Sequence, residues 1–255
     1  RKIGADLALF FSHPKSIFCF TDADCILAPN YLEKISSHYE NNNQNFAILG
    51  FKHQKSENNK LNRYINIYEK YLFETATNIK KTGSPYGYIS LGSCITCSAE
   101  SYLTVGGMNR LKATEDFYFL QKLTKHYGTA PEINEPLVYP SSRISSRVHL
   151  GTGYRMQQLS NGKSYKDLYF SDDSFLTLGD FIRIIKKSFG LSYKEIIQKL
   201  AKIDNITEFL EQNDFENIWN SLALNTNYRK YISQFHRWFD GLKTIKFLKY
   251  HSSIK

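Results

Sequence analysis

Long apolar runs are missing from this sequence. No uninterrupted apolar run approaches the ~20 residues that a membrane-spanning helix needs, and no signal peptide follows Arg1 and Lys2. The four cysteines do not form a paired metal-binding pattern. Cys94 and Cys97 have a redox-like spacing, but they fall in an apparent strand, where residues three apart point to opposite faces. We therefore interpret the cysteines as small buried side chains, and reduced thiols fit the cytoplasmic location that we predict.

Acidic residues are fewer than basic ones, 24 against 33, which gives a formal net charge of +9. This charge suggests an anionic partner such as phosphates, a lipid surface or nucleic acid, although ordinary solubilising charge explains most of the lysines equally well. Neither an aromatic RNA-binding strand nor a KH-type loop is present, so we expect no nucleic acid partner. The 42% hydrophobic and 15% aromatic content indicates a globular protein. Because the chain opens without Met and inside a helical pattern, we also expect it to be a fragment.

One stretch organises the chain: Ile-Phe-Cys-Phe-Thr-Asp-Ala-Asp, residues 17–24. Its apolar, β-prone start predicts a buried strand, and it ends in two carboxylates, Asp22 and Asp24, separated by one small residue. A helical pattern begins after Pro29, which completes a strand, acid pair, loop and helix. Ligands of open α/β sheets bind beyond the carboxyl ends of strands, where two acids suit a hard divalent cation. Simple turn chemistry of Asp is the alternative.

The remaining pattern predicts an α/β chain followed by helices. A second acid pair, Glu115 and Asp116, follows Thr114, a plausible N-cap, and acids are favoured in a first helical turn by the helix dipole. Gly106 and Gly107 are expected to end the helix before it, because glycine tolerates a left-handed backbone. We expect strands over 46–51, 86–96 and 133–139, the last at a sheet edge because of its prolines, and helices over 2–11, 61–81, 175–189, 193–201, 206–212, 215–224 and 228–250.

As an ordered set these motifs resemble family 2 glycosyltransferases with the GT-A fold. The resemblance rests on FCFTDADCILAPNYLEKI, on the Gly-Gly turn of the segment 105–109, and on Ala-Thr-Glu-Asp at 113–116, and it covers roughly residues 1 to 155. It implies a GT-A-like mixed sheet flanked by helices, the C-terminal part of a nucleotide-diphospho-sugar transferase fold that lacks its first strands. We therefore predict a glycosyltransferase domain over 1–160 and a helical region over 161–255.

The resemblance also implies site roles. Asp22 and Asp24 would hold Mn2+ or Mg2+ against the diphosphate of a UDP- or GDP-sugar, and Asp116 would be the base that deprotonates the acceptor hydroxyl. Glu115, with Gly107 and Met108, would bind the acceptor, either a glycan or a lipid-linked molecule. The implied reaction is metal-assisted single displacement with inversion, and bacterial polysaccharide biosynthesis is the usual setting of such enzymes.

A cluster of arginines, glycines and one histidine at 143–155 adds to the predicted donor site. Arginine forks suit phosphate oxygens, so we assign Arg147 and Arg155 to the donor diphosphate. His149 is a candidate third metal ligand, with a purely structural role as the alternative. The segment is not a P-loop, because the Gly-Lys-Ser/Thr ending is absent.

The last predicted helix, 228–250, is amphipathic and basic. We expect the apolar face of this helix to pack on the predicted glycosyltransferase domain, as such faces more commonly do. A peripheral contact with an anionic membrane is the alternative. The competing function for the whole chain is a non-catalytic basic module that binds anionic glycan, lipid or nucleic acid.

Overall fold

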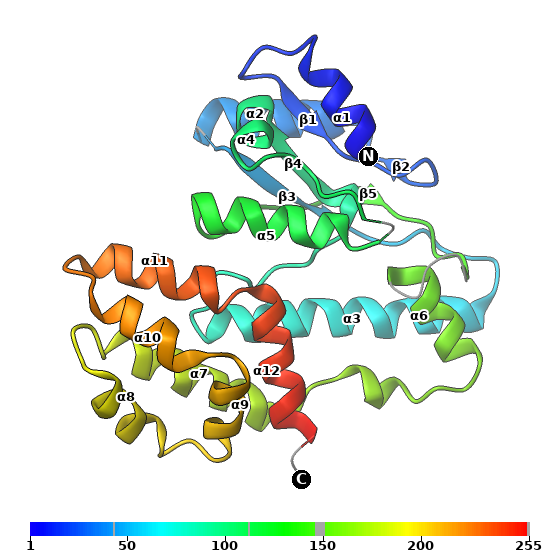
Figure 1. The fold of residues 1–255 in the computed structure, drawn as a ribbon. Coiled ribbons are helices and arrows are strands. Elements are labelled where there is room, and N and C mark those ends of the chain that lie inside the picture. The colour runs from blue at the N-terminus through cyan, green and yellow to red at the C-terminus, as the bar shows by residue number, and fades with distance from the viewer. Residues whose placement is uncertain (43, 112, 146–150, 254–255) are drawn as a thin grey trace. The chain divides into compact units, whose positions relative to one another are not determined.

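The computed structural model describes residues 1–42, 44–111, 113–145 and 151–253 (Figure 1). The chain forms two compact units. The first contains residues 1–73 and 89–168, and the second contains residues 74–88 and 169–255. The predicted division at 160/161 is therefore replaced by a discontinuous one, because the C-terminal turns of a long helix belong to the second unit. Among the described residues, no helix is both long and apolar enough to cross a membrane.

The first unit is a mixed α/β structure built on a five-stranded sheet of order β1-β4-β3-β5-β2. Antiparallel pairs join β1 to β4, β4 to β3 and β5 to β2, whereas β3 and β5 run parallel. Its elements are α1 (Lys2–Leu9), β1 (Ile17–Cys19), β2 (Ile26–Leu27), α2 (Tyr31–Asn42), β3 (Phe46–Phe51), the start of α3 (Asn59–Lys81), η1 (Gly92–Cys94), β4 (Ile95–Ser98), α4 (Ala99–Thr104), α5 (Glu115–Tyr127), β5 (Glu132–Tyr139), α6 (Gly151–Ser160) and η2 (Tyr165–Leu168).

The central strand β3 is buried on both faces, which explains its continuous apolar sequence. Leu49 and Phe51 join a core cluster with Tyr31 and Ile35 of α2. Phe46, whose side chain points the other way because residues alternate along a strand, meets the ring of Tyr127 in α5 at 6.2 Å. The two helices therefore cover opposite faces of the sheet.

Two strand predictions were wrong in detail. Most of the segment 86–96 is irregular, and a strand forms only over Ile95–Ser98 after a short 3-10 turn. β5 is not an edge strand, because it lies between β3 and β2. Its Pro136, which cannot donate to a ladder, lies opposite Gly50 where the register with β3 shifts.

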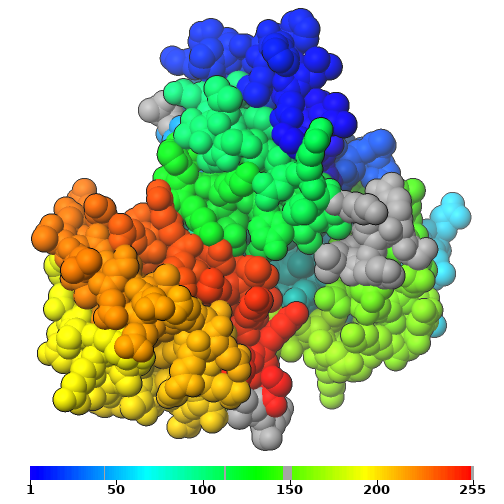
Figure 2. Space-filling model, viewed as in Figure 1, coloured from blue at the N-terminus to red at the C-terminus, as the bar shows by residue number. Residues whose placement is uncertain are grey.

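The second unit is helical. It contains the end of α3, α7 (Asp172–Lys186), α8 (Tyr193–Leu200), α9 (Ile206–Gln212), α10 (Phe215–Ala223), α11 (Tyr228–Trp238) and α12 (Gly241–Ser253). These helices share one core, which includes Ile79 of α3, Phe181 of α7 and Trp219 of α10. In the space-filling view the segments from α8 to α12, coloured yellow to red, form one continuous surface (Figure 2).

The predicted single helix over 228–250 is two helices. It breaks at Phe239 and Asp240, where Phe239 leaves helical geometry with ψ 70°. Phe235, Phe239 and Phe247 are completely buried in the helical core. The apolar stripe therefore packs inside the second unit's own core, and its main side chains are not available to a bilayer.

Candidate active site

The first acid pair lies in the turn that follows β1, as predicted. The Cys25 amide donates to the Asp22 carbonyl oxygen at 3.1 Å, which closes the turn before β2 begins. The Asp24 carbonyl oxygen accepts a 2.8 Å hydrogen bond from the Gln54 side chain, which also reaches the Tyr139 carbonyl oxygen at 2.7 Å. Gln54 therefore ties this turn to the end of β5.

The second acid pair opens α5, and Arg1 joins the two pairs. Its guanidinium hydrogen-bonds the Asp22 carboxylate with one nitrogen and Glu115 Oε1, at 2.5 Å, with the other. A Cβ on Gly92 would lie 2.5 Å from Cζ of Arg1, so the backbone of η1 closes over the same guanidinium. Acids far apart in the sequence are thus brought within the span of one side chain.

Aromatic packing explains this convergence. Phe20, just before the first acid pair, contacts Phe119, one helical turn after Glu115, with 5.5 Å between ring centroids. Tyr102 of α4 contacts both rings, at 6.2 and 5.4 Å. Because Phe20, Tyr102 and Phe119 are all buried, they fix the end of β1 against the start of α5.

Asp116 has the electrostatics of a potential general base. Burial raises the pKa of its carboxyl, the neighbouring Glu115 raises it further, and the Phe117 amide and Arg1 oppose the shift. The Phe117 amide donates to Asp116 Oδ1 at 2.7 Å. Conversely, burial lowers the pKa of Arg1, but the carboxylates of Asp22, Asp116 and Glu115 outweigh it and leave that pKa raised. A carboxylate with a raised pKa accepts a proton more readily at neutral pH.

Two carboxylates and one thiol offer a possible metal site. Ligand atoms of Asp22, Asp24 and Cys25 lie within 4.8 Å of one another. The carboxylate oxygens fit a hard cation such as Mg2+ or Mn2+, whereas the Cys25 thiol is a soft ligand that such ions do not favour. Both acids also have cationic partners, Arg1 on Asp22 and Arg143 on Asp24 at 2.8 Å. A metal ion at these carboxylates would therefore compete with two guanidinium groups.

Of the predicted donor-binding residues, Arg155 lies among the described ones. It is in α6, where its Nη1 donates to Gln158 Oε1 at 2.7 Å. Burial raises the pKa of Tyr68 in α3 to about 12; Tyr71 and Asp116 raise this pKa further, whereas Arg155 and the Thr152 hydroxyl oppose the shift. Arg147 and His149 lie outside the described residues.

The Gly-Gly turn before α5 has the predicted backbone. Gly106 and Gly107 have φ of 70° and 62°, and a Cβ on Gly107 would lie 2.9 Å from the Tyr102 ring. The Gly107 carbonyl accepts a 3.0 Å hydrogen bond from Lys122. Met108, predicted to touch the acceptor, is 1% exposed, so its side chain packs in the core. Thr114 precedes α5 but caps it without a side-chain bond, at φ 66°.

A buried hydrogen-bond network that the sequence patterns did not reveal supports α6. His53, whose side chain is fully buried, places Nδ1 2.8 Å from Glu69 Oε1 and Nε2 3.2 Å from Thr152 Oγ1. A carboxylate only accepts, so the Nδ1 of His53 donates to Glu69. The His53 amide also donates to Glu69 Oε1 at 2.6 Å. The loop after β3 and the start of α6 are thus fixed to α3.

The cysteines are free thiols. Cys94 and Cys97 are fully buried, as predicted, and burial raises the pKa of both thiols. Cys19 is exposed and Cys25 is partly exposed, so the expectation of buried side chains was wrong for these two.

No family model, curated protein or solved structure matches this chain.

Proposed function

We propose that this chain carries the catalytic part of an inverting glycosyltransferase with a GT-A-like fold. The observation that carries the proposal is the double contact of Arg1 with Asp22 and Glu115, because it places the two acid motifs, expected to bind donor and acceptor, at one site. The mixed sheet covered by helices on both faces agrees with such a fold, and the position of the first acids just beyond a strand end agrees with a ligand site.

The residues divide between the two substrates. Asp22 and Asp24 would hold a divalent cation, which when bound would neutralise charge on the leaving nucleoside diphosphate. Asp116 takes the proton from the acceptor hydroxyl as that oxygen attacks the anomeric carbon, and its raised pKa favours this transfer. Glu115 orients the acceptor. Arg155 of α6 adds positive charge on the donor side.

Isothermal titration with Mn2+ and UDP or GDP tests the donor site. We expect metal-dependent nucleotide binding that Asp24→Asn weakens by at least tenfold, since it loses one of two carboxylate ligands. Asp173→Asn, in the first turn of α7, removes the same charge from an exposed position of the second unit and is the matched control. A donor screen followed by anomeric analysis of the product would then identify the sugar and the stereochemistry.

The competing function makes the opposite prediction. A non-catalytic basic module would bind heparin or anionic vesicles without metal and would not bind Mn2+ with a nucleotide. That result would remove the glycosyltransferase proposal.

A further inference from the structure

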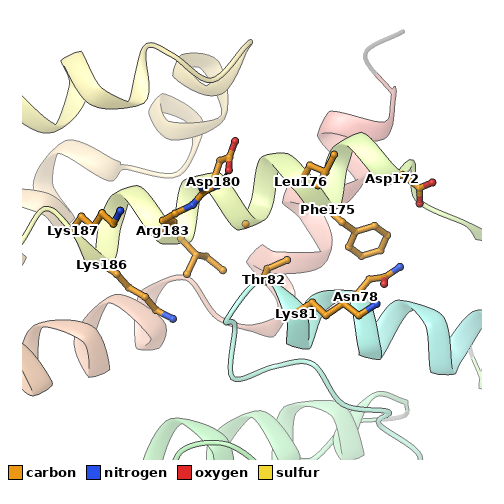
Figure 3. A pocket seen from close by; sticks show the side chains of 12 residues that line it. Asn78, Lys81, Thr82, Asp172, Phe175, Leu176, Asp180, Arg183, Lys186 and Lys187 are labelled. Carbon is orange, nitrogen blue, oxygen red and sulfur yellow. Dashed lines mark ion pairs between the residues drawn. The ribbon is translucent and has the colours of Figure 1, made fainter.

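The second unit contains a groove of about 670 Å3, lined by the C-terminal turns of α3 and by α7 (Figure 3). All of its lining residues belong to this unit. The volume lies within the range of small-molecule sites. None of the motifs used for glycosyl transfer contributes to it.

Along the groove wall that α7 contributes, the apolar and the cationic side chains lie toward different ends. Toward the helix start it presents Asp172 and two apolar side chains, Phe175 and Leu176. Toward the helix end it presents three cationic side chains, Arg183, Lys186 and Lys187, with Ile182 beside them. Gly179 lies between the two halves, and a Cβ there would contact Thr82 at 3.9 Å, so the absent side chain widens the groove. Figure 3 shows Lys186 and Lys187 near one end and Phe175 with Asn78 toward the other.

Part of the positive charge is not neutralised within the protein. Arg183 pairs with Asp180, and Lys186 donates to the Gly83 carbonyl oxygen at 3.1 Å. In the described part of the chain, Lys81 and Lys187 have no acidic partner. The groove thus has four cationic side chains and two acidic ones, Asp172 and Asp180.

The apolar half is also incompletely covered. Leu176 is 68% exposed, although Phe175 beside it is partly buried against the helical core. An exposed leucine in the wall of a groove gains free energy when an apolar group covers it, roughly in proportion to the area removed from water. The groove therefore combines an unsatisfied apolar surface with an excess of positive charge.

We propose that this groove binds a single anionic amphiphile, a phosphate head on an alkyl chain. Lys187 and Lys186 contact the head through charge-assisted hydrogen bonds, and the chain lies along Leu176 and Phe175. This site is separate from the proposed glycosyl transfer and does not depend on it.

Titration of the full chain with dodecyl phosphate below its micelle concentration tests the site, by calorimetry and by NMR. We expect saturable binding of one molecule, with NMR shifts confined to residues 78–83 and 172–187. Lys187→Glu and Leu176→Asp should each weaken binding about tenfold or more. Lys199→Glu on α8 and Leu224→Asp after α10 change similarly exposed positions of the same unit outside the groove, and should leave the affinity unchanged.

Several results would overturn the proposal. They are the absence of saturable binding, an equal loss in Lys199→Glu, equal affinity for dodecyltrimethylammonium, or inorganic phosphate bound as tightly as the amphiphile. Binding to anionic vesicles without binding to the monomer would assign the charge to membrane-surface contact instead. Because no nucleotide or metal is used, loss of the glycosyltransferase proposal would leave these outcomes unaffected.

Discussion

At the scale of single residues, the site is a balance between clustered acids and the arginines that face them. Arg1 contacts Asp22 and Glu115, and Arg143 contacts Asp24, so the described acids are not left to repel one another. Asp116 has no direct ion pair of this kind in the described structure, and burial raises its pKa. The residue best suited to take a proton is thus the one whose charge is least well stabilised.

Because the Asp116 charge is poorly stabilised, Asp116→Asn should lower activity without lowering stability. A carboxyl whose pKa is raised on folding stabilises the folded state below its ordinary pKa, and that contribution is lost as the pH rises through the raised value. The variant should therefore melt no lower than the wild type at pH 7, with the difference between them shrinking toward pH 4. If the chain has the proposed glycosyltransferase activity, that activity should fall at least about a hundredfold, the usual size of a general-base contribution.

Calorimetry from pH 4 to 8 and assay of released nucleotide measure the two effects. Near-normal turnover in Asp116→Asn would show that another group is the base. A lower melting temperature at pH 7 would show that the Asp116 charge is stabilised by contacts other than those described above.

The buried His53 network gives a second prediction at this scale. His53→Leu leaves the Glu69 carboxylate, 15% exposed, without its main partner, and should lower the free energy of unfolding by about 3 kcal/mol. Thr152→Val removes one hydrogen bond to Nε2 of His53 and should cost only about 1 kcal/mol. Urea unfolding of both variants measures the two losses of unfolding free energy. Equal losses would mean that the network does not stabilise the protein by pairing the Glu69 charge.

The same network also predicts that the free energy of unfolding falls at acid pH. Burial alone raises the pKa of Glu69, but the hydrogen bonds from His53 outweigh burial and leave that pKa lowered. A lowered carboxyl pKa gives stability that is present above the ordinary value and lost as the pH falls through the folded-state value. Glu69→Gln should therefore flatten the fall in unfolding free energy below about pH 4.5, the ordinary pKa of a glutamate. An unchanged fall at acid pH would contradict this assignment.

At the scale of elements, the backbones of β3 and β5 approach each other closely at Gly50. The register shifts at Gly50, and a Cβ there would lie 2.6 Å from the Asn134 carbonyl oxygen. Glycine is therefore required at this position by the approach of the neighbouring strand. The bulge also places Pro136 where no ladder hydrogen bond is needed.

Gly50→Ala should accordingly destabilise the protein by about 2 kcal/mol, the cost of forcing extra volume into a packed site. Gly4→Ala is the matched control, because Gly4 lies inside α1 and a Cβ added there would have no atom within 4 Å apart from its chain neighbours and the nearby backbone of its own helix. That control should be stabilising by about 0.5 to 1 kcal/mol, since alanine is the better helix former. Similar changes in the two variants, measured by urea unfolding, would argue against the close strand contact.

At the scale of the whole molecule, the two units share the helix α3. Its residues up to Phe73 belong to the first unit and those from Glu74 to the second. Ile79, near the end of the helix, is 4% exposed and belongs to the core formed by α7 to α12. The helical unit is therefore built from two separate stretches of the chain.

Ile79→Ala should behave as a mutation in the helical core and cost about 3 kcal/mol. Hydrogen exchange should accelerate in α7 and α12, while β3 and β5 keep their protection. Faster exchange in the sheet with unchanged α7 would contradict the assignment of this helix end to the second unit.

The sequence by itself determined the local features of this protein. The apolar run of β3, the glycine-ended α4, the acid pair after β1 and most helices follow from periodicity and capping, which depend on near neighbours in the chain. The sequence did not reveal the helix break at Phe239, because the spacing of apolar residues continues through this position. The chain turns there because the Phe239 ring packs against Phe181 and Phe209. The sequence also placed the strand Ile95–Ser98 too early, because the β-prone residues before it, 86–94, predicted a strand over 86–96.

Only the tertiary structure decided which distant side chains meet. The contact of Phe20 with Phe119 brings the two acid motifs together, and no spacing in the chain encodes that distance. Likewise, Arg1, Gln54 and His53 carry no motif, and their partners lie on other elements. A sequence pattern reports what one helix or strand needs, whereas a site depends on how several of them pack.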